Sequence, residues 1–84
     1  MLGKQLLSNI ELETLEEILK TSGNDKKFDV LGANGVFKIH DIEANETMSL
    51  PVGLGVLAPV IRDNCKDSES TKVMSELFKR MGVK

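Results

Sequence analysis

The segment from Phe28 to Asp41 constrains the fold most, because two short alternating runs flank the dipeptide Asn34-Gly35. Asn-Gly in this setting is the strongest short-range signal for a type I′ hairpin turn. A two-residue turn also fixes the register of the two strands. The expected pairs are Val30 with Ile39, Gly32 with Phe37, Leu31 with Lys38, and Asp29 with His40. The apolar side chains of the hairpin then share one face: Phe28, Val30, Phe37 and Ile39.

An amphipathic helix is predicted before the hairpin. Ser8 and Glu11 form an S-x-x-E capping box, in which each side chain accepts a hydrogen bond from the backbone N–H of the other residue. Apolar residues at helical spacing follow the box, and Gly23 is a natural stop. We expect a helix from about Asn9 to Thr21.

A second amphipathic helix is predicted at the C-terminal end. Apolar residues recur at helical spacing from Val73 to Met81, and Gly82 ends the pattern. Glu76 precedes Arg80 by four residues, the favourable order for an ion pair along a helix. Three residues offer alternative N-terminal caps: Asp67, Ser68 and Ser70.

The segment from Met48 to Ile61 is uncharged and begins with strict alternation of apolar residues with Ser, Pro and Gly. A period of two favours a strand over a helix. Pro51 cannot donate to a strand ladder, which confines such a strand to a sheet edge or a bulge. Residues 57–62 could form a further strand or a short helical turn around Pro59, and we favour the strand.

These elements predict an α+β fold in a single domain spanning residues 1–84, since a chain of this length forms one core. The sheet is expected to be antiparallel with three or four strands, including the hairpin at 28–41. The N-terminal and C-terminal amphipathic helices are expected to pack on one of its faces.

Composition argues against several classes of protein. The net charge of −2 gives no general attraction to nucleic acid or anionic lipid. The single cysteine, Cys65, argues against a disulfide-stapled secreted protein, and the sequence shows no signal peptide or membrane span, so we expect a cytoplasmic protein. One histidine and one cysteine cannot build a structural zinc site without unusual use of carboxylates. We expect no metal and no cofactor.

The sequence also lacks a recognisable catalytic set. His40 is the only side chain suited to acid–base chemistry near neutral pH, and no nucleophile is placed beside it. Residues 53–58 fit the G-x-G-x-x-A dinucleotide-binding pattern, but Pro59 follows at once and a second parallel strand has no room. We expect a non-enzymatic protein.

The uncharged segment 48–61 is the main functional signal, because an exposed apolar edge must be covered. Either the C-terminal helix of the same chain packs on it, or a second chain does, and we favour the second chain. We expect a protein–protein interaction or assembly protein, homo-oligomeric, of the kind found as phage or mobile-element accessory or structural proteins. The expected interface residues are Met48, Leu50, Val52, Leu54, Val56 and Leu57. The alternative is a nucleic-acid-binding regulator that uses the basic side of the last helix: Lys72, Lys79, Arg80 and Lys84.

Overall fold

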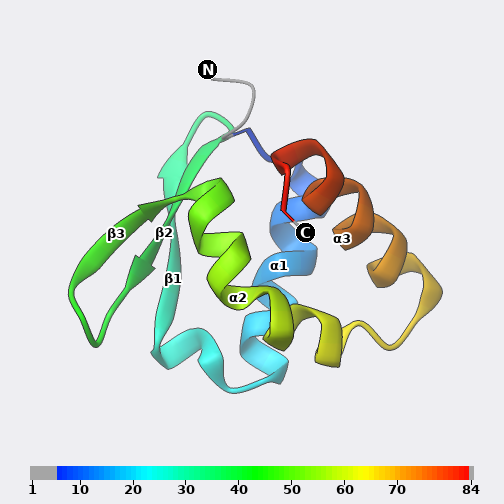
Figure 1. The fold of residues 1–84 in the computed structure, drawn as a ribbon, viewed down its shortest axis with the longest axis horizontal. Coiled ribbons are helices and arrows are strands. Elements are labelled where there is room, and N and C mark those ends of the chain that lie inside the picture. The colour runs from blue at the N-terminus through cyan, green and yellow to red at the C-terminus, as the bar shows by residue number, and fades with distance from the viewer. Residues whose placement is uncertain (1–5, 84) are drawn as a thin grey trace.

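A computed structural model describes residues 6–83 of the 84-residue chain. Within this range the chain forms three α-helices and one three-stranded antiparallel sheet (Figure 1). The elements are α1 (Asn9–Thr21), the short 3-10 helix η2 (Asn24–Lys26), β1 (Phe28–Ala33), β2 (Val36–Asp41), β3 (Glu46–Ser49), α2 (Leu50–Asn64) and α3 (Ser68–Met81). The predicted α+β class and antiparallel sheet are confirmed.

The hairpin has the predicted turn and the predicted register. Asn34 and Gly35 have φ angles of 57° and 83°, and positive φ at both central residues is the requirement of a type I′ turn. Val30 pairs with Ile39, and each of the other expected pairs is present. β2 is the central strand, with β1 on one side and β3 on the other. The prediction is therefore confirmed residue by residue.

α1 has the predicted bounds, and α3 begins at one of the three alternative caps and ends at the predicted glycine. The capping box of Ser8 and Glu11 is complete, and α1 spans the predicted residues 9–21. Asp67 is the N-cap of α3, where its side chain accepts a hydrogen bond from the Ser70 backbone N–H. Gly82 closes α3 in the left-handed conformation, with a φ of 74°.

The strand predicted from Met48 onward is wrong beyond its first two residues, which end β3. For residues 57–62 the helical alternative is correct and the favoured strand is wrong, because these residues belong to a helix. β3 ends at Ser49, and α2 runs from Leu50 to Asn64. The buried residues of α2 recur at intervals of three and four, which is the helical period. They are Leu50, Gly53, Leu54, Leu57, Ala58 and Ile61.

Two sequence signals concealed this helix. Leu50 and Leu54 lie an even number of residues apart, so they satisfy both the period of a strand and the spacing of one helical turn. Pro51 lies in the first turn of α2, where a backbone N–H has no helical partner to lose. The proline therefore marks a helix start and not the edge strand that the alternating pattern predicts.

The helix that packs directly on the sheet is α2. It contacts β2 and β3, and its Gly53 lies against the side chain of Ile39. α1 and α3 contact α2 and each other, so α2 lies between the sheet and these helices (Figure 1). The predicted packing of the two terminal helices on one sheet face is not confirmed.

Candidate functional site

The outer face of α2 exposes apolar side chains. Val52 and Val56 are 56% and 52% exposed, which makes them the two most exposed large hydrophobic residues among residues 6–83. They lie one helical turn apart, and the exposed Gly55 and Pro59 continue the same face. We call Val52, Gly55, Val56 and Pro59 the α2 stripe.

The predicted interface residues therefore divide into two groups. Val52 and Val56 are exposed as an interface requires. Leu50, Leu54 and Leu57 are at most 1% exposed and belong to the core, so these three assignments are wrong. Met48 is half-buried and packs against the core. A helix directs the leucines and the valines to opposite sides, whereas a strand would place them on one face up to Val56.

The two ends of α2 differ electrostatically. Its N-cap, Ser49, makes no side-chain capping hydrogen bond, and the first turn carries no acidic residue. The N–H groups of that turn carry a partial positive charge that no acidic residue of the turn itself balances. At the other end, Asp63 is exposed and lies four residues beyond Pro59, so it continues the line of the α2 stripe.

A groove of about 440 Å³ separates the C-terminal half of α2 from α3. Its floor is closed to solvent, because Ile61, Met74 and Phe78 are each less than a tenth exposed. The guanidinium of Arg62 lies 5.6 Å from the centre of the Phe78 ring and covers it. The Arg62 side chain thus covers part of the apolar floor of the groove.

Cys65, at the edge of this groove, is not an activated thiol. Burial raises its pKa, and the neighbouring Asp67 carboxylate raises it further. The thiol is therefore protonated at neutral pH, and the thiolate is the nucleophilic form.

The sheet places the single histidine, His40, beside a hydroxyl group. His40 lies opposite Asp29, and its Nδ1 atom is 3.1 Å from the Thr47 hydroxyl on the neighbouring strand. Within the described range, no three His, Cys, Asp or Glu side chains gather as metal ligands would. None of the helices described is both long and apolar enough to cross a membrane.

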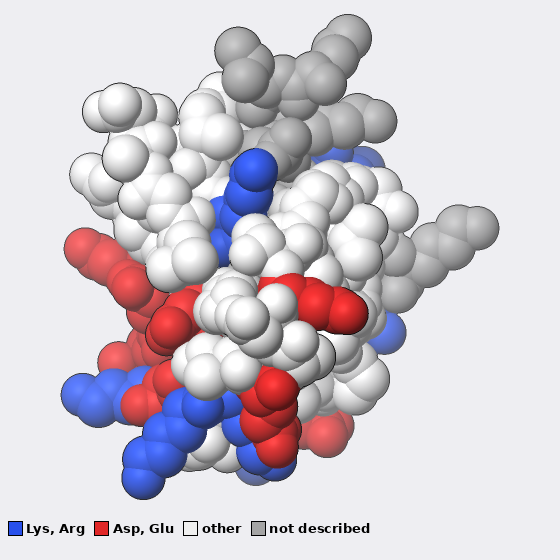
Figure 2. Space-filling view, turned by 90° about the vertical axis from the view of Figure 1, so that its left-hand side faces the viewer, with Lys and Arg blue, Asp and Glu red and all other residues white. Residues whose placement is uncertain are grey.

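The alternative nucleic-acid surface is only partly available. Lys72 and Lys79 are exposed on α3, and Lys84 lies outside the described residues. Arg80 is already engaged, because it forms an ion pair with Glu11 rather than the predicted pair with Glu76. On the side of the molecule that faces away from α3, where β3 lies, acidic and basic side chains are interspersed (Figure 2).

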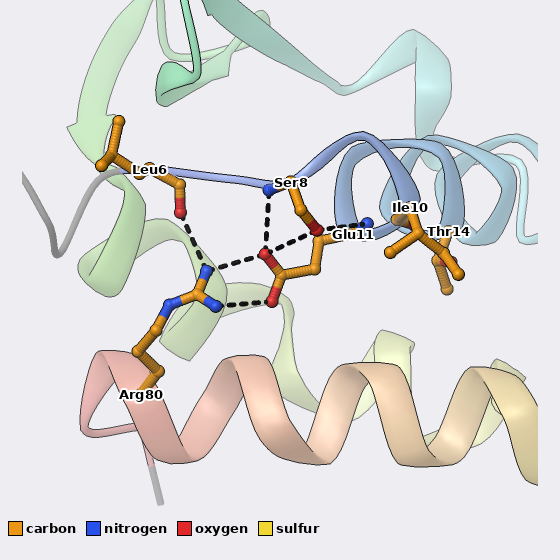
Figure 3. A network of polar contacts seen from close by, with 6 residues as sticks. All are labelled: Leu6, Ser8, Ile10, Glu11, Thr14 and Arg80. Atoms are coloured by element: carbon orange, nitrogen blue, oxygen red, sulfur yellow. Dashed lines mark hydrogen bonds and ion pairs between the residues drawn. The ribbon is translucent and has the colours of Figure 1, made fainter.

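The ion pair of Arg80 joins the two ends of the described chain (Figure 3). Both terminal nitrogens of the guanidinium donate to the Glu11 carboxylate, at 2.9 and 2.8 Å. One of them also donates to the Leu6 carbonyl oxygen at 2.9 Å. The carboxylate accepts a further bond from the Ser8 backbone N–H at 2.9 Å. The capping box of α1 and the last turn of α3 thus share one carboxylate.

Stability is expected to fall with acid because of this carboxylate. Burial raises the pKa of Glu11, but hydrogen bonds from Arg80 and Ser8 outweigh burial and hold the pKa below its ordinary value. A lowered native pKa stabilises the fold above the unfolded-state pKa of about 4.3, and this contribution is lost as pH falls through the native value. Thermal melts of wild type and Glu11→Gln between pH 7 and pH 3 measure it. The difference in melting temperature between the two proteins should shrink toward pH 3. A difference that stays constant contradicts a lowered pKa for Glu11 in the folded protein.

Two residues of the α2 stripe, Val52 and Val56, are among the interface residues expected from the sequence, but the helix that exposes them was not predicted. A test of residues 50–61 against a helical period would have separated the buried leucines from Val52 and Val56. The Glu11–Arg80 pair joins residues 69 positions apart and has no local sequence signal. Comparisons with protein-family models, with curated proteins and with solved structures find no match, so the geometry above is the basis for function.

Proposed function

We propose that this chain is a small non-enzymatic interaction or assembly protein that associates with copies of itself through the α2 stripe. The observation that carries the proposal is the exposure of Val52 and Val56 on adjacent turns of one helix. A reducing, cytoplasmic setting suits the free thiol of Cys65. An accessory or structural role of the phage or mobile-element kind belongs to the same proposal.

The composition of α2 supports a covered outer face. From Leu50 to Ile61 the helix contains no charged residue, so it is apolar on both faces. A helix that is apolar all round is normally buried all round, whereas a surface helix presents polar side chains to water. The inner face of α2 contacts the sheet. On the outer face, the side chains of Val52 and Val56 are exposed to solvent.

Gly55 independently supports the proposal that another helix covers the outer face of α2. A Cβ atom at this position would meet no atom within 4 Å, so packing within the chain does not require a glycine. A glycine inside a helix costs about 1 kcal/mol relative to alanine. The absence of a side chain does allow another helix to approach closely, because the side chains at the contact set the distance between helix axes.

Replacing Val56 with aspartate is expected to weaken self-association at least tenfold. The substitution places a charge at the centre of the α2 stripe, and a desolvated, unpaired charge is costly in an interface. Sedimentation velocity over a wide concentration range measures the average mass. Leu31→Asp is the matched control, because Leu31 is also an exposed hydrophobic residue, at 45%, but lies on β1.

Wild type and Leu31→Asp should both increase in mass with concentration, while Val56→Asp stays near the mass of one chain. A wild-type mass that remains that of one chain throughout contradicts self-association. Equal loss of association in both variants would show that general surface apolarity, and not the α2 stripe, drives it.

A further inference from the structure

We infer that two copies of α2 pair in antiparallel orientation about a twofold axis that passes between Gly55 and Val56. This inference rests on the proposed self-association and specifies its geometry. A twofold interface requires a patch that is complementary to itself. The α2 stripe meets this requirement, because its four residues are symmetric in position about the midpoint of Gly55 and Val56.

The antiparallel register follows from burying the whole stripe. With the axis at its midpoint, Val52 of one copy faces Pro59 of the other, and Gly55 faces Val56. The side chain of Val56 then fills the space that Gly55 leaves open, twice per dimer. A register shifted toward the C-terminal end would instead place Val52 of one copy against the exposed Asp63 of the other. Such a shift buries a charge against an apolar side chain.

Electrostatics favour the same orientation. In the antiparallel pair, Asp63 of each copy reaches the N-terminal end of the other copy's α2. That end has no side-chain cap from Ser49 and no acidic residue in its first turn. A carboxylate stabilises a helix N-terminus, and antiparallel helices also align their dipoles favourably. A parallel pair would place the two Asp63 carboxylates side by side.

The contact is small, so the dimer is expected to be weak. Four residues per copy, one of them a glycine, are few beside the roughly 20–30 residues per partner of a standard interface. We therefore expect association to be concentration-dependent and Asp63 to modulate it. Asp63→Asn should raise the dissociation constant about two- to fivefold, whereas Asp29→Asn, an exposed aspartate on β1, should not.

Disulfide trapping tests the register directly, in a background where Cys65 is replaced by serine. Val52→Cys and Pro59→Cys proteins are oxidised separately and as a mixture. The mixture should form a cross-linked heterodimer, because the two positions face each other. Val52→Cys alone should not cross-link, because its two copies lie about 10 Å apart along the helix axes, beyond the reach of a disulfide. Mixing Val52→Cys with Glu16→Cys, an exposed position on α1, measures random collision.

Each outcome decides the inference. A heterodimer well above the collision control supports it, and a Val52→Cys homodimer overturns it in favour of parallel pairing. If the mass increases with concentration but no heterodimer forms, the antiparallel register is wrong and self-association stands. A mass of one chain at all concentrations contradicts both, and binding to phosphatidylcholine vesicles by such a monomer would assign the stripe to a lipid surface.

Discussion

Replacing Gly53 with alanine is expected to lower the free energy of unfolding by about 2 to 3 kcal/mol. The new Cβ atom would lie against Cγ1 of Ile39 and 2.5 Å from its Cβ. Ile39 is fully buried on the central strand, so it has no open space into which to move. The gain in helix propensity from removing a glycine, about 1 kcal/mol, offsets only part of this clash. The close approach of α2 to the sheet thus depends on this glycine.

Gly55→Ala provides the matched control for this substitution. It lies two residues further along the same helix, and a Cβ there would meet no atom within 4 Å. We expect the unfolding free energy to rise by about 0.5 to 1 kcal/mol, the ordinary effect of replacing a helical glycine. Chemical denaturation of the two variants should therefore shift the midpoint in opposite directions from wild type.

A double-mutant cycle identifies Ile39 as the residue that Gly53 accommodates. Ile39→Ala alone should cost about 2 to 5 kcal/mol, since it empties a buried site. The double variant Ile39→Ala, Gly53→Ala should be more stable than the sum of the two single effects predicts, because the truncation removes the atoms that clash. Additive effects, or a Gly53→Ala protein as stable as Gly55→Ala, would contradict the proposed contact.

Local signals determined how much of the fold could be predicted from the sequence. The hairpin and the caps of α1 and α3 depend on residues within a few positions of one another, and all were found. α2 was missed because its period is ambiguous over a short span and because Pro51 is compatible with either structure. The close contact between Gly53 of α2 and the Ile39 side chain of β2 is not visible in the local sequence.

The candidate site shows the same limit. Val52 and Val56 were predicted as interface residues because they are apolar and lie in an uncharged segment. Their neighbours Leu54 and Leu57 were predicted for the same reason and are buried. Composition alone cannot separate the two groups, because exposure depends on which face of a helix meets the sheet.

Replacing Arg80 with methionine is expected to lower the free energy of unfolding by about 2 kcal/mol. The residue left behind, Glu11, is only 6% exposed, and it would keep its charge while losing two hydrogen bonds. Removing one partner of a fully buried ion pair costs about 3 to 5 kcal/mol. The Arg80 side chain is 45% exposed, so water replaces part of the lost interaction and the cost is smaller.

Two control variants separate charge, geometry and general helix effects. Arg80→Lys keeps the charge but cannot donate two parallel hydrogen bonds to the carboxylate, so we expect about half the loss. Lys79→Met removes an exposed charge from the same turn of α3 and should change the unfolding free energy by less than about 0.5 kcal/mol. Urea denaturation at pH 7 compares all three proteins.

The position of the lost contacts should also be visible in amide hydrogen exchange. Arg80 donates to the Leu6 carbonyl oxygen and to the carboxylate that caps α1, so its loss frees the first turn of α1 before it affects the sheet. The Ser8 N–H, which donates to Glu11, should exchange faster in Arg80→Met, while β2 amides change only with global stability. Equal changes in both regions, or none in the first turn of α1, would show that the ion pair does not hold the N-terminal cap to α3.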